Sequence, residues 1–185
     1  MQAPELFHAR PRRLTRSEYD RIAELGFFRG ERVELIHGMV VQMSPIGPLH
    51  AEVVDRLMAR LVRVLPRSVR VRIQQPFIAA DESEPEPDVA IVSERSYASG
   101  HPSAATLIIE VAETSLRYDR ETKAALYAAS NVAEYWIVDV TARRVEIYAG
   151  AVDGRYARVR EATMGEELTP EAFPEVTLSI GELLE

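Results

Sequence analysis

The sequence has no cysteine, which excludes disulfides, zinc–thiolate sites and thiol nucleophiles. It also has no apolar run near the roughly 18 residues that a membrane-spanning helix needs. Its first residues, MQAPELFHARPRR, lack the apolar core of a signal peptide. From these absences we expect a cytoplasmic protein without a membrane partner.

Lysine is nearly absent as well. Of the 22 basic residues, 21 are arginine, and Lys123 is the only lysine. Arginine is a planar cation that hardly titrates, whereas lysine is a compact point charge whose pKa can be tuned. Because coding preference accounts for a strong arginine bias, we interpret the single exception as a residue retained for its chemistry.

An excess of positive charge is also missing, since the formal net charge is −7 at pH 7. Binding to DNA draws on counterion release by many cationic contacts, so this balance opposes such a partner, although the distribution of charge matters more than its sum. The length of 185 residues fits one domain. We expect a leader over residues 1–13 and a single domain over residues 14–185.

Apolar periodicity and turn residues predict helices and strands that alternate along the chain. A capping-box pattern at Thr15 and Glu18 starts a helix that runs to Leu25, and His37–Gly38 joins two short strands in a hairpin. The further predicted elements are, in order, a helix over 48–65, an alternating stretch over 69–80, strands over 87–92 and 106–113, a helix over 116–130, strands over 134–139, 143–150 and 155–161, and a short helix after Ser179. This order predicts an α/β fold, a three-layer domain with a central mixed β-sheet flanked by helices.

The predicted helix over 48–65 carries Arg56, Arg60 and Arg63 in one sector, opposite its apolar stripe. Two interpretations stand side by side, a solvated face and a surface that contacts phosphate groups. Glu52 dilutes the positive charge of the sector, which favours the solvated face.

Glu110 is the most unusual residue of the predicted strands, because it interrupts the apolar run LIIEVA. An ionised carboxylate there loses much of its hydration, which costs several kcal/mol unless a partner compensates it. The partner is an arginine from elsewhere in the chain, a bound proton or a bound cation. The strand itself contains no basic residue.

Asp88 follows Pro87 at the start of another apolar strand, and proline keeps the chain extended at this point. If the two strands are neighbours, Asp88 and Glu110 place two carboxylates on one metal ion. A hard cation held by few carboxylates, several waters and a substrate phosphate is the coordination style of Mg²⁺.

Lys123 lies in the helix that follows the Glu110 strand. It stands four residues after Asp119, the spacing of an ordinary helical ion pair. At about 100° per residue, however, it falls on the same stripe as Leu126 and Tyr127, so we expect it to face the sheet. Next to two carboxylates, its ammonium group polarises an attacking water or neutralises a phosphate in the transition state.

Pro87–Asp88, Glu110 in IIEV and a nearby lysine resemble the motif of the PD-(D/E)XK nuclease superfamily. More narrowly, the stretches ERVELIHG, EPDVAIV and LIIEVAETSLRYDRETKAALYAASNVAEYWIVD resemble the Uma family of endonucleases, which is abundant in bacteria. The resemblance covers roughly residues 14–182. The chain departs from the superfamily pattern at Ala112, where the usual lysine would stand, and the lysine corresponds instead to Lys123 on the following helix.

This resemblance implies a restriction-endonuclease-like fold, a Mg²⁺ or Mn²⁺ cofactor and DNA as the substrate. It further implies that Asp88 and Glu110 bind the metal, that Lys123 is catalytic, and that Glu34, in the family's hairpin motif, completes the site. His50 and Gln75 are weaker candidates; for His50 a satisfied core histidine is at least as good an interpretation.

Two other functions stay open. One is a non-catalytic interaction or regulatory domain that retains the nuclease fold, which the acidic net charge favours. The other is a nuclease that acts on RNA or on nucleotides. Because nucleases that cut both strands are often dimers, a homodimer is also an open alternative.

Overall fold

The computed structural model describes residues 11–185, which form two compact units. The first unit extends to Ser44 and includes Ala80–Glu84, and the second contains Pro45–Ala79 and Pro85–Glu185. Residues 1–10 of the expected leader lie outside the described residues. The single domain over residues 14–185 stays a prediction.

The first unit begins with helix α1 (Arg16–Glu24), whose start is fixed by the capping box that the sequence predicts. The Thr15 side chain accepts from the Glu18 amide, and the Glu18 carboxylate accepts from the Thr15 amide. Strands β1 (Val33–Ile36) and β2 (Met39–Gln42) then form the predicted antiparallel hairpin. Its turn residues His37 and Gly38 both have positive φ, at 49° and 74°, as a two-residue turn of type I′ requires.

The acidic stretch before Pro85 pairs with strand β1 of this hairpin. The sequence did not predict this pairing. The Glu84 amide donates to the carbonyl of Leu35 at 2.7 Å, and the His37 amide donates to Ser83 Oγ at 2.9 Å. The segment Ala80–Glu84 therefore belongs to the first unit through backbone pairing with β1.

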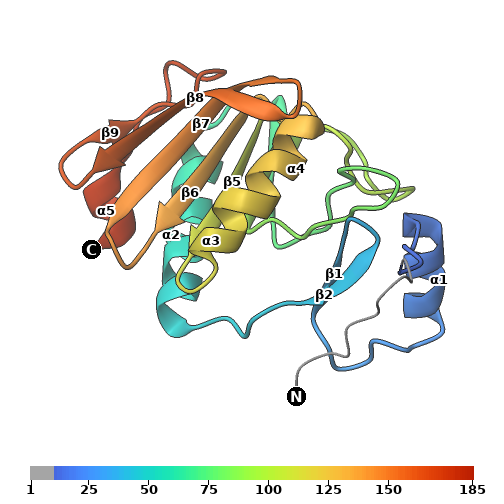
Figure 1. Ribbon diagram of the computed structural model, residues 1–185. Coiled ribbons are helices and arrows are strands. Elements are labelled where there is room, and N and C mark those ends of the chain that lie inside the picture. Colours follow the sequence, from blue (N-terminus) through green and yellow to red (C-terminus); the bar gives the residue numbers. More distant parts are fainter. Residues whose placement is uncertain (1–10) are drawn as a thin grey trace. The chain divides into compact units, whose positions relative to one another are not determined.

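The second unit is built on a six-stranded sheet in the order β3-β4-β5-β6-β7-β8. Its strands are β3 (Val69–Ile73), β4 (Val89–Ser93), β5 (Leu107–Ala112), β6 (Glu134–Asp139), β7 (Arg144–Val152) and β8 (Arg155–Thr163). Neighbouring strands are antiparallel except β5 and β6, which are parallel. The mixed sheet with helices on its faces confirms the predicted fold class (Figure 1).

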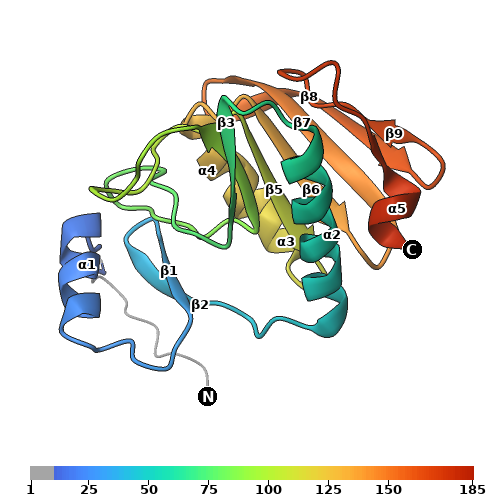
Figure 2. The same cartoon turned by 180° about the vertical axis from the view of Figure 1, so that it is seen from behind.

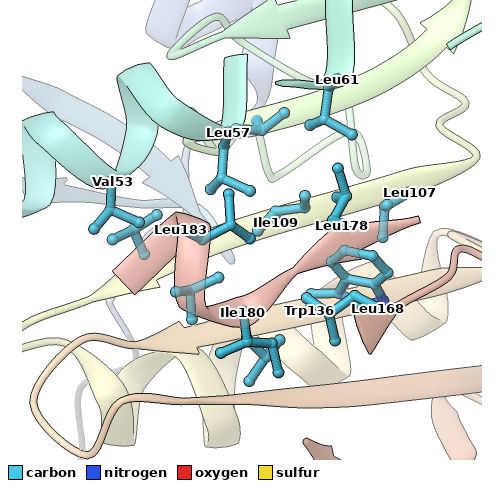
Figure 3. Close-up of a cluster of buried hydrophobic side chains, with 14 of the residues drawn as sticks. Val53, Leu57, Leu61, Leu107, Ile109, Trp136, Leu168, Leu178, Ile180 and Leu183 are labelled. Carbon is cyan, nitrogen blue, oxygen red and sulfur yellow. The ribbon is translucent and has the colours of Figure 1, made fainter. Parts of the chain in front are cut away.

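One face of the sheet packs against α2 (Pro48–Val64), α5 (Ile180–Leu184) and the short strands β9 (Glu167–Leu168) and β10 (Leu178–Ser179) (Figure 2). Leu57 and Leu61 of α2 meet Ile109 and Trp136 of the sheet in a fully buried cluster (Figure 3). The apolar stripe of α2 supplies this contact, as its spacing predicts.

The opposite face is covered by the chain from Leu116 to Ala129, which connects the parallel strands β5 and β6 (Figure 1). It consists of α3 (Leu116–Tyr118), a π-helical segment η1 (Asp119–Lys123) and α4 (Ala124–Ala129). The sequence predicts one uninterrupted helix here, and the π segment is the difference. The Ala124 amide donates to the carbonyl of Asp119, five residues earlier, and the Tyr135 hydroxyl of β6 donates to the same carbonyl at 3.3 Å.

No helix within residues 11–185 is long and apolar enough to cross a membrane.

Candidate active site

Two carboxylates meet where β4 begins beside β5. Val89 of β4 pairs with Ile109 of β5 in antiparallel register, so Asp88, one residue earlier, lies opposite Glu110. Residues directly opposite each other in an antiparallel pair have their side chains close together. The Asp88 amide donates to Glu110 Oε2 at 3.3 Å, and both side chains are buried.

Lys123 reaches this pair from the π segment. Its Nζ donates to Glu110 Oε1 at 2.8 Å, and the Tyr127 hydroxyl donates to the same oxygen at 2.7 Å. Only 5% of Lys123 and 3% of Glu110 is exposed, so the two form a buried ion pair. The partner of Glu110 is thus the single lysine of the chain and not an arginine. A π-helical turn at such a position is common in functional sites.

Asp88 is fixed by donors from three other segments. His50, in the first turn of α2, lies with Nε2 2.9 Å from Asp88 Oδ1, and the Gln74 side-chain amide donates to that oxygen at 3.2 Å. The Val111 amide donates to Oδ2 at 2.9 Å. The structure therefore brings His50 into the cluster, where the sequence left it a weaker candidate.

Gln75 is exposed and does not contact Asp88; its neighbour Gln74 does. The alternating pattern of the sequence continues past Ile73, but β3 ends at that residue. Gln74 then takes a positive φ of 49°, which turns its side chain out of the strand alternation. The expected glutamine is thus displaced by one residue.

Glu34 lies in β1 of the first unit and is 3% exposed. Asp88, Glu110 and Lys123 all belong to the second unit. A contribution of Glu34 to the site stays a prediction.

The charges in this cluster are not balanced. Burial raises the pKa of Glu110 to about 8 against the opposing effect of Lys123, and the nearby carboxylates of Asp88 and Asp119 raise it further. For Asp88, burial also acts to raise the pKa, but the hydrogen bonds from His50 and Val111 outweigh it and the pKa is lowered. The same bond to Asp88 raises the pKa of His50. Glu110 therefore sits where one further positive charge would stabilise its ionised form.

The carboxylate oxygens offer a place for that charge. Asp88 Oδ2 and Glu110 Oε2 each accept one backbone hydrogen bond, from Val111 and Asp88 respectively, and a carboxylate oxygen has room for a second partner. Within residues 11–185, no three His, Asp or Glu side chains gather in a metal-binding group. Mg²⁺ usually keeps several waters and binds through one or two protein carboxylates, so this pair could supply the protein ligands of such an ion.

Tyr127 and Gln74 are the site residues that sequence reasoning missed. Tyr127 stands four residues after Lys123, the spacing that places two side chains on one helical face. That spacing was the signal available in the sequence. For Gln74 no comparable signal exists, since its role depends on where β3 ends.

Comparisons with known proteins bear on the family and the fold of the chain. The Uma2 family model, described as "Putative restriction endonuclease", matches residues 16–181 of the chain. Among solved structures, the chain is similar to the "Crystal structure of a putative nuclease belonging to DUF820 from Anabaena variabilis ATCC 29413", with a TM-score of 0.72, 15% sequence identity, and coverage of 92% of this chain and 97% of that chain. At this identity the likeness shows the fold alone. The search among curated proteins gave no significant match.

Proposed function

This chain belongs to the Uma2 family of the restriction-endonuclease type, and on that premise we propose that it is a metal-dependent endonuclease that hydrolyses phosphodiester bonds in DNA. The observation that carries the proposal is the buried cluster of Asp88, Glu110 and Lys123, in which two adjacent carboxylates face a single ammonium group. Mg²⁺ or Mn²⁺ is the proposed cofactor.

Asp88 and Glu110 would hold the cation through the oxygens that retain acceptor capacity. A divalent cation supplies, when bound, positive charge for a phosphate and a water of lowered pKa. The hydrogen bonds from His50, Gln74 and the Val111 amide keep the Asp88 carboxylate in one orientation. Ligands held by such partners need no reorganisation when the metal enters.

Lys123 has two tasks in this proposal. Its bond to Glu110 Oε1 orients that carboxylate, a task that it shares with the Tyr127 hydroxyl. Its ammonium group also places a fixed positive charge where negative charge develops on the phosphate, in a site shielded from water, where such a charge acts strongly.

Cleavage of supercoiled plasmid tests the proposal. We expect nicking with Mg²⁺ or Mn²⁺, none with EDTA, and none by the Asp88→Asn variant with either metal. RNA and mononucleotide substrates are assayed under the same conditions, and cleavage of one of these in place of DNA would identify a different substrate class. Absence of cleavage of every substrate by the wild-type protein would contradict the proposal.

The rival function is a non-catalytic interaction domain that retains the fold, and the net charge of −7 favours it. Calorimetric titration with Mn²⁺ separates the two. A nuclease binds the ion and loses binding in Asp88→Asn, whereas a non-catalytic domain gives no heat in either protein.

A further inference from the structure

The edge strand β3 carries arginines on the sheet face that α3 and α4 cover in part. Val69, Val71 and Ile73 pack against the core on the α2 side. Since strand side chains alternate between the two faces, Arg70 and Arg72 point to the opposite face. β3 has a neighbour on one side only, so these arginines stand at the rim of the sheet.

A tyrosine gathers these side chains into one cluster. The guanidinium carbons of Arg70, Arg72 and Arg95 lie 6.0, 5.3 and 5.0 Å from the centre of the Tyr97 ring. The Tyr97 hydroxyl donates to the carbonyl of Ser93 at 3.0 Å, which fixes the ring against the end of β4. We call these four residues (Arg70, Arg72, Arg95 and Tyr97) the Tyr97 cluster.

The Tyr97 cluster has more positive charge than its neighbours neutralise. Arg70 pairs with Glu94, but within the described chain neither Arg72 nor Arg95 has a carboxylate at ion-pair distance. The Nε atom of Arg72 is buried and has no hydrogen-bond partner among those residues. Burial, together with the charge of Arg70, lowers the pKa of Arg72. Like charges gathered in this way cost free energy that an anionic ligand would offset.

The arginines of α2 provide a contrast. Arg56 pairs with Glu52 at 2.8 Å and Arg60 pairs with Glu182 at 2.9 Å. The charges of these two arginines are neutralised within the second unit, which supports the solvated-face interpretation for them, whereas Arg63 of the same sector is exposed and has no carboxylate at ion-pair distance among the described residues. In the Tyr97 cluster, by contrast, three guanidinium groups share one ring, and only Arg70 has a carboxylate partner among the described residues.

The Tyr97 cluster lies along the same pair of strands, β3 and β4, as the candidate active site. Arg72 lies two residues before Gln74, whose side chain donates to Asp88. At a strand rise of about 3.3 Å per residue, Arg70 and Arg72 are roughly 7 Å apart along β3. The guanidinium groups gather at the Tyr97 ring beside Ser93, five residues after Asp88, so the cluster lies roughly 16 Å along β4 from the carboxylates at a rise of about 3.3 Å per residue.

We propose that the Tyr97 cluster binds the sugar–phosphate backbone of the substrate strand on one side of the bond that is cut. This inference rests on the proposed nuclease function and adds a substrate-positioning surface to it. Contacts to phosphates hold the register of a nucleic acid and carry no sequence information. The cluster consequently strengthens the binding of all sequences equally.

The test compares Arg72→Gln and Arg95→Gln with the control Arg63→Gln, an exposed arginine of α2. Binding of a labelled DNA duplex is measured by fluorescence anisotropy in EDTA, without cleavage, over a series of salt concentrations. We expect each cluster variant to weaken binding several-fold and to lower the slope of log K against log salt by about 0.9, the loss of one phosphate contact. The control keeps the wild-type affinity and slope.

A second readout uses bis(4-nitrophenyl) phosphate with Mn²⁺, a diester too short to reach the Tyr97 cluster from the active site. Each cluster variant should hydrolyse it at the wild-type rate, whereas the KM for DNA should rise. Wild-type affinity and salt slope in both cluster variants would overturn the inference, as would an equal loss on both substrates. Failure of the wild-type protein to hydrolyse either substrate would instead overturn the proposed function. Because Arg95 is exposed, its variant keeps the test available if Arg72→Gln does not fold.

Discussion

Replacing Lys123 with methionine removes the ammonium group and keeps most of the side-chain volume. In the structure this group lies 2.8 Å from Glu110 Oε1 and is almost completely buried. Loss of one charge-stabilising donor from a catalytic site lowers kcat by roughly 10²–10³. We therefore expect Lys123→Met to lower the rate of DNA cleavage by at least about 100-fold.

The same substitution should cost less stability than its burial suggests. Removing one partner of a buried ion pair costs about 3–5 kcal/mol when the other stays charged. Here burial raises the pKa of Glu110 to about 8, so its carboxyl group can hold a proton at neutral pH, and the Tyr127 hydroxyl still contacts it. We expect a loss of less than about 3 kcal/mol at pH 7, which leaves the protein folded.

Plasmid nicking with Mn²⁺ measures the rate, and urea unfolding measures the stability. Arg117→Met is the matched control, because Arg117 is an exposed cation close to Lys123 in the chain and pairs with Glu121; it should leave both quantities unchanged. The expected loss is roughly 100-fold. If Lys123→Met cleaves DNA at a rate within about threefold of the wild type, the catalytic role of Lys123 is refuted.

Four further predictions concern individual side chains. Burial raises the pKa of Glu110 to about 8, so below that pH a metal ion must displace the proton of this carboxyl group. The affinity for Mn²⁺, measured by calorimetry, should therefore rise from about pH 6.5 to about pH 8.5, on either side of about 8. Equal affinity at the two pH values would contradict this. In the metal-free protein, the raised pKa of Glu110 contributes folding stability that is fully present below about pH 4.5 and is lost as the pH rises through about 8. Denaturant unfolding at several pH values should show this loss in the wild type and not in Glu110→Gln. His50→Ala removes the donor at 2.9 Å from Asp88 and should weaken Mn²⁺ binding about 10-fold to 100-fold, as loss of a partner of a metal ligand does, whereas Met58→Ala on the exposed side of α2 should not. Leu57→Ala empties a fully buried position and should lower the free energy of unfolding by about 2–5 kcal/mol; a loss below 1 kcal/mol, well under that range, would contradict the described packing.

The central pair of carboxylates could be anticipated because its signals are local. Pro87–Asp88 marks the start of a strand, and Glu110 interrupts an otherwise apolar run, so each carboxylate stands out in the sequence. Lys123 stands out by composition. Antiparallel pairing of β4 with β5 then brings the two carboxylates together. From the sequence, this proximity is expected only if the two strands are neighbours in the sheet.

What the sequence did not predict depends on contacts between distant segments. The π segment is held by the Tyr135 hydroxyl from β6, and no local pattern in Asp119–Lys123 announces it. The position of Gln74 follows from the end of β3 at Ile73, and strand ends are set by pairing with a neighbouring strand. The backbone pairing of Glu84 with Leu35 joins residues nearly 50 positions apart, beyond the reach of periodicity.

The most direct test of a divalent-metal site is a crystal of the wild-type protein soaked in Mn²⁺ and measured for anomalous scattering. We expect one strong peak within coordination distance of Asp88 Oδ2 and Glu110 Oε2, and no such peak in crystals of Asp88→Asn. A saturating soak that leaves these two oxygens without a peak would contradict this expectation.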